Sequence, residues 1–135
     1  MALFAWNNGY SVNVQEIDNQ HKVLVDIINK LHDSMKVGKG KEVIGEILDE
    51  LVTYTVFHFG HEEKLFSGNG YSDTNRHKAE HKKLIEQVQN LQNDFKSGKT
   101  LITMEIMNFL KDWLSNHIMV TDKKYSSYLN SNGIY

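Results

Sequence analysis

Apolar side chains recur at alternating steps of three and four residues along four segments of this chain. Steps of this size place side chains on one face of an α-helix. Glycine-containing stretches near residues 38–40, 68–70 and 98 separate the segments, and glycine is common just past helix ends. The sequence has no proline that would kink a segment. We therefore predict an all-α protein, an up-down-up-down four-helix bundle.

The predicted bundle fills the middle of a single domain of 135 residues. Residues 1 to about 17 show no sustained period, so we expect an N-terminal arm anchored by Trp6 and Tyr10. The bundle is expected from about 18 to 122, and a C-terminal tail from about 123 to 135. Asp18 and Thr100 are predicted N-caps of the first and fourth helices, because a short side-chain oxygen accepts well from the first helical turn.

Polar side chains interrupt the apolar face of every predicted helix. Burying a polar group without a partner costs about 2–7 kcal/mol, and an unpaired charge costs more. Six such groups would consume the whole stability of a domain, about 5–15 kcal/mol. We infer that the six groups satisfy one another or bind a common ligand: His21, His58, Glu62, His77, His81 and His117.

The spacing of these groups is typical of metal ligands. His58 and Glu62 lie one helical turn apart, as do the two histidines of the third segment, so each pair can converge on one ion. Asp122 is less regular, because it follows His117 by five residues and falls about 140° out of line on a regular helix. Asp122 can join a site only if the helix ends, unwinds or carries a π-bulge there.

The mixture of ligands indicates the kind of metal. Imidazole with carboxylate suits zinc, iron, copper or nickel, whereas calcium and magnesium prefer oxygen. Five imidazoles are too many for one tetrahedral zinc, so two ions are expected. With two six-coordinate ions, two bridging carboxylates and one bridging solvent oxygen, a single coordination position stays open. Such a buried dinuclear site suits a small diatomic ligand.

Composition narrows the partners further. Fifteen basic and seventeen acidic residues give a net charge of −2, which argues against nucleic acid as a partner. The chain has no cysteine, which excludes thiol catalysis, disulfides and iron–sulfur clusters. No apolar run reaches the ~20 residues of a membrane span, and the N-terminus does not look like a signal peptide. We expect a soluble, cytoplasmic protein, with a monomer as the default.

Four short motifs resemble those of the hemerythrin family, in particular its single-domain bacterial form, bacteriohemerythrin. Residues 18–21 (DNQH) resemble the family's D-x-Q-H segment, and residues 58–63 (HFGHEE) its H-F-x-x-E-E motif. Residues 77–81 match H-x-x-x-H, and residues 113–118 followed by Asp122 resemble W-L-x-x-H-I…D. The resemblance covers nearly the whole chain. Myohemerythrin is itself a standard example of an up-and-down bundle, so the resemblance and the expected fold are not independent.

The resemblance implies two iron ions and a division of the ligands between them. His77, His81 and His117 would hold one iron, and His21 and His58 the other, which keeps the open position. Glu62 and Asp122 would bridge the pair alongside an oxo or hydroxo group. The implied function is reversible O₂ binding, for oxygen carriage, storage or delivery, with an O₂-consuming enzyme as a conceivable client. Nitric oxide or small anions are further candidate ligands.

Several residues around the motifs also matter to this interpretation. Leu114 and Ile118 flank His117 and are expected to line an apolar O₂ pocket that keeps water and anions from the open iron. We expect His32 to be structural or solvated. His61 is a candidate to contact a metal-binding side chain without itself binding the metal. Asn13 stands where the family often has glycine, and Ser72 stands where proline is common.

Other classes of function stay open at this stage. His77 to His81 also reads H-x-x-E-H, an inverted zincin pattern, but that motif leaves three other histidines unexplained. A di-iron oxygenase would use Glu-x-x-His pairs, and no glutamate here has histidine three residues later. Weak peroxidase or nitric-oxide chemistry and O₂ or redox sensing through a separate partner remain alternatives. A purely structural bundle would be indifferent to metal removal.

Overall fold

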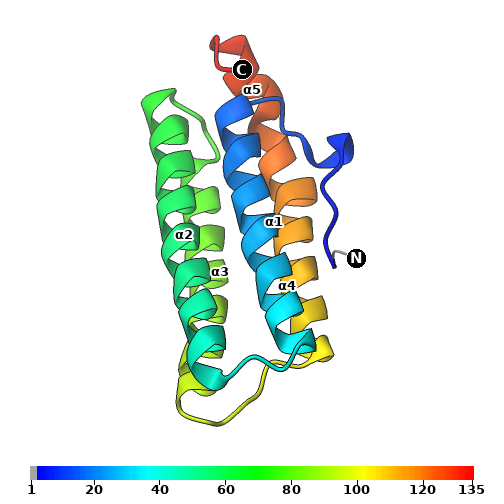
Figure 1. Ribbon diagram of the computed structural model, residues 1–135. Helices are drawn as coiled ribbons and strands as arrows, with labels where there is room; N and C mark the ends of the chain where they lie inside the picture. Colours follow the sequence, from blue (N-terminus) through cyan, green and yellow to red (C-terminus); the bar gives the residue numbers. More distant parts are fainter. Residues whose placement is uncertain (1–2) are drawn as a thin grey trace.

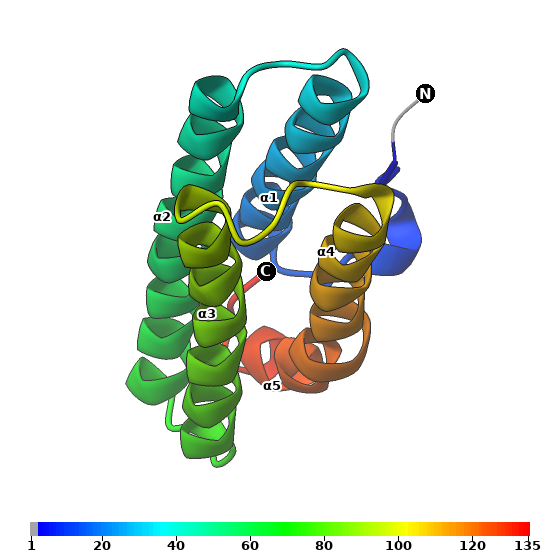
Figure 2. The ribbon, with the colours of Figure 1, turned by 90° about the horizontal axis from the view of Figure 1, so that it is seen from below.

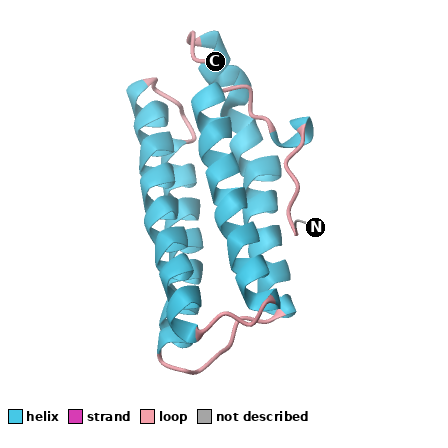
Figure 3. Ribbon diagram, viewed as in Figure 1, coloured by secondary structure: helices cyan, strands magenta, loops and turns pink. Residues whose placement is uncertain are grey.

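The computed structural model describes residues 3–135, apart from the side chains of residues 120–122. Helices α1 (Gln15–Lys36), α2 (Lys41–Gly68), α3 (Thr74–Lys96) and α4 (Met104–Asn116) form the body of the molecule (Figure 1). A 3₁₀ turn η1 (Asn8–Tyr10) precedes them, and η2 (His117–Thr121), η3 (Asp122–Tyr125) and α5 (Ser126–Ser131) follow. The part of the chain that is described contains helix and loop and no strand (Figure 3).

The four long helices run alternately up and down, which confirms the predicted bundle. Viewed along the bundle, α1 lies beside α2 and α4, and α3 lies beside α2 (Figure 2). Because the directions alternate, the starts of α1 and α3 meet the ends of α2 and α4 at one end, where α5 also lies (Figure 1). No described helix is both long and apolar enough to cross a membrane.

The predicted apolar faces form the core. Ile17, Leu24, Leu51, Val88 and Leu110 are all buried between the helices. Thr55, a polar member of the α2 face, is buried too, and its hydroxyl donates to the carbonyl of Leu51 at 2.7 Å. Hydrogen bonding within the helix therefore satisfies this threonine without any outside partner.

The N-terminal arm is held mainly by a residue that the sequence did not single out. Phe4 is 1% exposed, and its backbone N–H and carbonyl pair with the side-chain amide of Asn29 at 2.9 and 2.8 Å. Trp6 and Tyr10, the predicted anchors, are half-buried, and their ring centroids lie 5.6 Å apart. The arm thus follows the bundle through paired backbone groups as well as aromatic contact.

The predicted N-caps of the first and fourth helices were wrong. Helix α1 begins at Gln15, and the carboxylate of Asp18, inside it, accepts from the N–H of Val12 at 2.8 Å and the hydroxyl of Ser11 at 2.6 Å. Asp18 therefore ties the preceding loop to the helix. Helix α4 is capped by Thr103, whose hydroxyl accepts from the Ile106 N–H, so the helix starts later than a cap at Thr100 would give.

The C-terminal segment packs on the bundle rather than hanging free. Tyr125 and Leu129 are both 0% exposed. Ser126 donates from its hydroxyl to the carbonyl of Val12, and Asn130 donates from its amide to the carbonyl of Asn13. These bonds join the two ends of the chain beside the end of the bundle that carries the candidate ligands.

Candidate metal centre

Two clusters of potential metal ligands lie in the core and share one carboxylate. His21, His58 and Glu62 form the first cluster; Glu62, His81 and His117 form the second. Within each cluster the donor atoms lie within 4.8 Å of one another. All five side chains are at most 3% exposed. Glu62 is therefore placed where one carboxylate can serve two ions.

Helix α2 supplies the centre of the arrangement. His58 and Glu62 lie one turn apart, with Nε2 of His58 2.8 Å from Oε1 of Glu62. His21 enters from α1, and its ring meets the ring of His58 edge-on with centroids 4.6 Å apart. His58 and Glu62, which the sequence places one turn apart, are thus in direct contact. His21 from α1 completes the first cluster.

The second cluster draws on α3 and the end of α4. Nε2 of His81 and Nε2 of His117 each lie 3.8 Å from the same Oε1 of Glu62. His77 lies one turn before His81, with their ring centroids 5.7 Å apart, and is 2% exposed. His77 belongs to neither three-residue cluster, but it lies beside the second one.

Asp122 was the irregular member of the predicted ligand set, and its side chain lies outside the described residues. The backbone before it is described: the regular helix α4 ends at Asn116, and His117–Thr121 forms a π-helical turn. A π-turn has hydrogen bonds between residues five apart instead of four. The helix thus carries the local irregularity that a ligand five residues beyond His117 requires.

The outer nitrogens of two cluster histidines meet residues whose roles the sequence did not reveal. Nδ1 of His58 lies 2.6 Å from the amide oxygen of Gln20, and Nδ1 of His81 lies 3.1 Å from Oε2 of Glu63. The hydroxyl of Tyr125 donates to Oε2 of Glu62 at 2.7 Å. Gln20 and Glu63 lie within the sequence motifs, each directly beside a predicted ligand, and this position is the sequence signal that could have identified them. Tyr125 lies outside every motif.

An aromatic ring also holds the second cluster in place. Phe59 stacks on His81 with ring centroids 4.0 Å apart and planes 6° from parallel. The centroid of the Phe59 ring lies 5.0 Å from the ring centroid of His117 and 6.5 Å from that of Trp113. Phe59 thus limits how far two of the imidazoles can turn.

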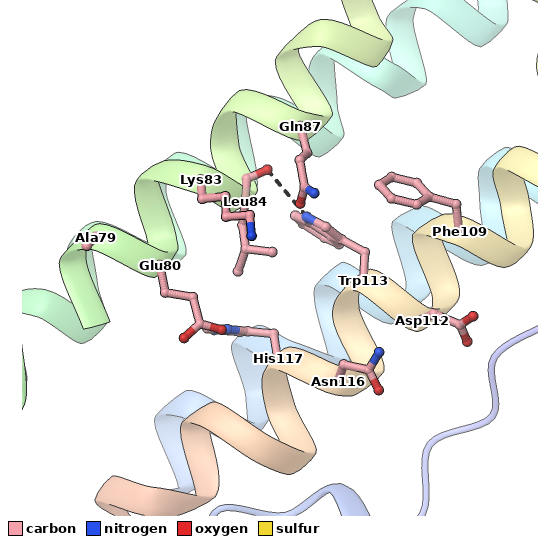
Figure 4. A pocket seen from close by; sticks show the side chains of 10 residues that line it. All are labelled: Ala79, Glu80, Lys83, Leu84, Gln87, Phe109, Asp112, Trp113, Asn116 and His117. Atoms are coloured by element: carbon pink, nitrogen blue, oxygen red, sulfur yellow. Dashed lines mark hydrogen bonds between the residues drawn. The ribbon is translucent and has the colours of Figure 1, made fainter. Parts of the chain in front are cut away.

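The predicted pocket residues are deeply buried. Leu114 is 1% exposed and Ile118 is 0% exposed. His117 therefore lies between two buried apolar residues of the same segment. A groove of about 740 Å³ between α3 and α4 reaches His117 from outside, with Trp113 donating to the carbonyl of Leu84 at 3.3 Å along it (Figure 4). From α3, Glu80 points toward His117 (Figure 4).

The two remaining histidines lie away from the clusters. His32 is 6% exposed, with Nδ1 3.9 Å from Asp33, and belongs to the core further along α1. Nε2 of His61 lies 3.3 Å from Oε1 of Glu16, so it links α2 to the start of α1 at the surface. Neither residue belongs to the two clusters of donor atoms.

The donor set suits a pair of transition-metal ions. Imidazole nitrogens with one shared carboxylate match iron, zinc or copper in ligand type, and they do not match calcium or magnesium. An inverted zincin would use His77 and His81 for one ion, yet His81 converges with Glu62 and His117. Taken together, fold and site define a four-helix bundle built around a buried metal-binding centre of two linked clusters.

Comparison with known proteins identifies the family. The profile of the hemerythrin HHE cation binding domain matches residues 12–129. Bacteriohemerythrin of Methylococcus capsulatus is 41% identical over 132 residues, covering 97% of this chain and all of that protein. Bacteriohemerythrin of Pseudomonas aeruginosa strain PAO1 is 38% identical over 125 residues, covering 93% of this chain and 80% of that protein. The chain belongs to the hemerythrin family.

Solved structures agree with this membership. A crystal structure of wild-type hemerythrin superimposes with a TM-score of 0.88 at 40% identity, covering 95% of this chain and 98% of the other. A leucine-to-phenylalanine mutant superimposes with a TM-score of 0.89 over 96% of this chain and 98% of the other. The resemblance drawn from the sequence motifs is thereby confirmed.

Proposed function

We propose that this protein binds O₂ reversibly at a non-haem di-iron centre and serves in oxygen carriage, storage or delivery. The observation that carries the proposal is Glu62, whose Oε1 lies within 3.8 Å of the Nε2 atoms of His58, His81 and His117. One buried carboxylate facing imidazoles from three helices is the arrangement that a carboxylate-bridged pair of ions needs.

The ligands divide between the two irons as the family resemblance implies. His21 and His58 would hold the iron with the open position, and His77, His81 and His117 would hold the other. Glu62 and Asp122 would be the carboxylate ligands that the two ions share. When bound, the iron pair supplies the open coordination position and the two electrons that O₂ binding requires.

The protein's own residues orient the donors and keep water away. Gln20 and Glu63 accept from the outer nitrogens of His58 and His81, which fixes the ring orientations. Tyr125 holds the second oxygen of Glu62, so that Oε1 faces the histidines. Leu114 and Ile118 form the apolar wall that slows loss of bound oxygen and oxidation to an inactive state.

We propose a binding protein rather than an enzyme. A nitrogen-rich donor set with one saturated iron favours reversible binding over oxidation of a substrate. Steady-state turnover of peroxide or nitric oxide tests this statement, and turnover well above that of free iron would contradict it. Cytoplasmic location and a monomeric state stay predictions, which cell fractionation and size-exclusion chromatography test.

The deciding experiment combines metal analysis with a visible spectrum, cycled between the anaerobic reduced protein and air. We expect about two irons per chain and a charge-transfer band that appears with O₂ and fades when O₂ is removed. Two irons with irreversible oxidation would move the function to redox or nitric-oxide chemistry. Zinc, or no metal, would overturn the proposal.

A matched pair of variants connects the spectrum to the clusters. His58→Ala removes a donor that faces Glu62 at 2.8 Å, and we expect it to abolish the O₂-dependent band and reduce the iron content. His32→Ala removes another buried histidine of the core, outside the clusters, and should leave the band and the iron content unchanged. Equal losses in both variants would show that general core damage, not loss of a ligand, explains the effect.

A further inference from the structure

The two clusters differ in the residues that contact the outer ring nitrogen, Nδ1, of their histidines. In the first cluster, Nδ1 of His58 contacts a neutral amide, the side chain of Gln20, which is 7% exposed. Behind His81 of the second cluster stands a carboxylate, Glu63, whose side chain is 26% exposed. Both partners contact Nδ1, the ring nitrogen that faces away from Glu62.

These contacts indicate that Nδ1 of each imidazole carries a proton. A carboxylate and an amide oxygen can only accept hydrogen bonds, so Nδ1–H of each imidazole is the donor. Each Nε2 faces Oε1 of Glu62, and a metal ion bound between these atoms would take the Nε2 lone pair. Gln20 and Glu63 therefore hold both histidines in the tautomer that can bind a metal.

The two partners contact the same ring nitrogen, Gln20 at 2.6 Å and Glu63 at 3.1 Å, and they differ in charge. A hydrogen bond to an ionised carboxylate is about twice as strong as one between neutral groups, and it pushes electron density onto the imidazole. His81 is thus the stronger electron donor and His58 the weaker one. A second acidic side chain, Glu80, points toward His117 of the same second cluster (Figure 4). Among these contacts, both acidic side chains lie beside histidines of the second cluster.

We infer that Glu63 and Gln20 are positioning residues that make the two metal positions unequal. Glu63 strengthens His81, so the second position holds its ion more tightly and stabilises the ferric state. Gln20 orients His58 without strengthening it, so the first position stays the more easily reduced one. This inference rests on the proposed di-iron function and adds the effect of two residues outside the metal sphere to the asymmetry that the unequal number of histidines already gives that centre.

The direct test is Glu63→Gln, which keeps an accepting oxygen and removes the charge. Anaerobic titration with Fe²⁺ should show one of the two binding steps weakened by about 10–100-fold, with the other unchanged. The midpoint potential of the loaded centre should rise. Glu63→Asp, which keeps the charge, should recover part of both effects. Neither measurement depends on O₂.

Glu50→Gln is the matched control, because Glu50 also lies on α2 and pairs only with surface Lys30 at 3.1 Å. It removes one carboxylate from the same helix without touching a histidine, and both binding steps should match those of the parent protein. A shift equal to that of Glu63→Gln would assign the effect to net charge and overturn the inference. Unchanged binding steps and potential in Glu63→Gln would overturn it as well.

Gln20→Glu tests the opposite change at the first position. Adding a carboxylate behind His58 should tighten the other Fe²⁺ binding step and lower the midpoint potential, which reduces the difference between the two positions. If the buried charge impairs folding, ¹⁵N NMR of the imidazoles in the unaltered protein still tests the arrangement. Protons on Nδ1 of His58 and His81 are expected, and an unprotonated Nδ1 on either would contradict it.

Failure of this inference is distinguishable from failure of the proposed function. Fe²⁺ binding steps that do not respond to Glu63→Gln, with a reversible O₂ band, would leave the function intact and overturn the role of Glu63. Two inequivalent sites that respond to Glu63→Gln, without a reversible O₂ band, would support the asymmetry and overturn the function.

Discussion

Tyr125 donates a 2.7 Å hydrogen bond from its hydroxyl to Oε2 of Glu62, across 63 residues of sequence. Both side chains are 0% exposed. The other oxygen of the same carboxylate faces His58, His81 and His117. The segment after α4 therefore fixes the orientation of the one carboxylate that both clusters share.

Tyr125→Phe should weaken both the fold and the metal centre. A buried hydrogen bond to a charged group contributes about 1.5–3 kcal/mol, so urea denaturation of the metal-free protein should show a loss in the free energy of unfolding within that range. The Fe²⁺ affinity should fall as well, because Glu62 loses the partner that orients it. Tyr128→Phe is the control: it removes a hydroxyl bonded to the carbonyl of Asn69, and it should leave metal affinity unchanged. An unchanged affinity in Tyr125→Phe would remove the orienting role.

Leu114→Ala should speed autoxidation of the oxygenated protein. Truncating this 1%-exposed side chain opens the apolar wall beside His117 to water and anions. Loss of a buried leucine also costs about 2–5 kcal/mol of stability, so the autoxidation rate must be compared at a temperature where the variant is folded.

Leu110→Ala separates the pocket effect from the loss of packing. Leu110 is 0% exposed on the same face of α4, seven residues before His117 and so about 10 Å away along the helix. It should lose comparable stability without the change in autoxidation. The role assigned to Leu114 would be refuted if the two variants autoxidised at the same rate.

Asn13→Ala should destabilise the loop before α1. Asn13 has φ 58°, in the left-handed region that asparagine tolerates better than other non-glycine residues. A residue with an ordinary Cβ pays about 1–2 kcal/mol there, so we expect a lower free energy of unfolding by roughly 1 kcal/mol in urea denaturation. Asn13→Gly should be neutral or slightly stabilising, because glycine adopts a positive φ without strain. Equal stability in both variants would contradict this reason.

Asp49 should make the acid stability of the protein depend on α3. Hydrogen bonds from Lys96 at 2.7 Å and Gln92 at 2.6 Å lower the pKa of the Asp49 carboxyl. Because the folded pKa lies below the unfolded one, about 3.9, the contribution is complete above that pH and is lost as pH falls through the lowered value. Asp49 is half-exposed, so the contribution is at most about 1 kcal/mol. In Asp49→Asn, the free energy of unfolding measured as pH falls should decrease less than in the parent protein, by that amount.

A double-mutant cycle with Lys96→Gln checks the origin of this effect. If the Asp49–Lys96 ion pair contributes this acid stability, the double variant should lose no more of it than Asp49→Asn alone. Additive losses would show that the two residues act independently.

The sequence predicted the bundle and most of the residues at its centre. Regular steps of three and four residues fix which side chains share a helix face, since helix periodicity is a local property. Polar groups such as His21 and His117 on those faces stood out because an unpartnered polar group is costly in a core. The cap of α4 at Thr103 was missed because Thr100 and Thr103 lie three residues apart and are equally suitable caps by residue type.

Only the tertiary structure decided how these residues meet. Alternating helix directions bring His21, near the start of α1, beside His58, near the end of α2, although 37 positions separate them in the chain. The contacts of Gln20 with His58 and of Tyr125 with Glu62 join residues 38 and 63 positions apart, and no local pattern encodes such pairings. The chain's periodicity determines which groups enter the core, because it acts within each helix; the packing between helices determines which of them converge.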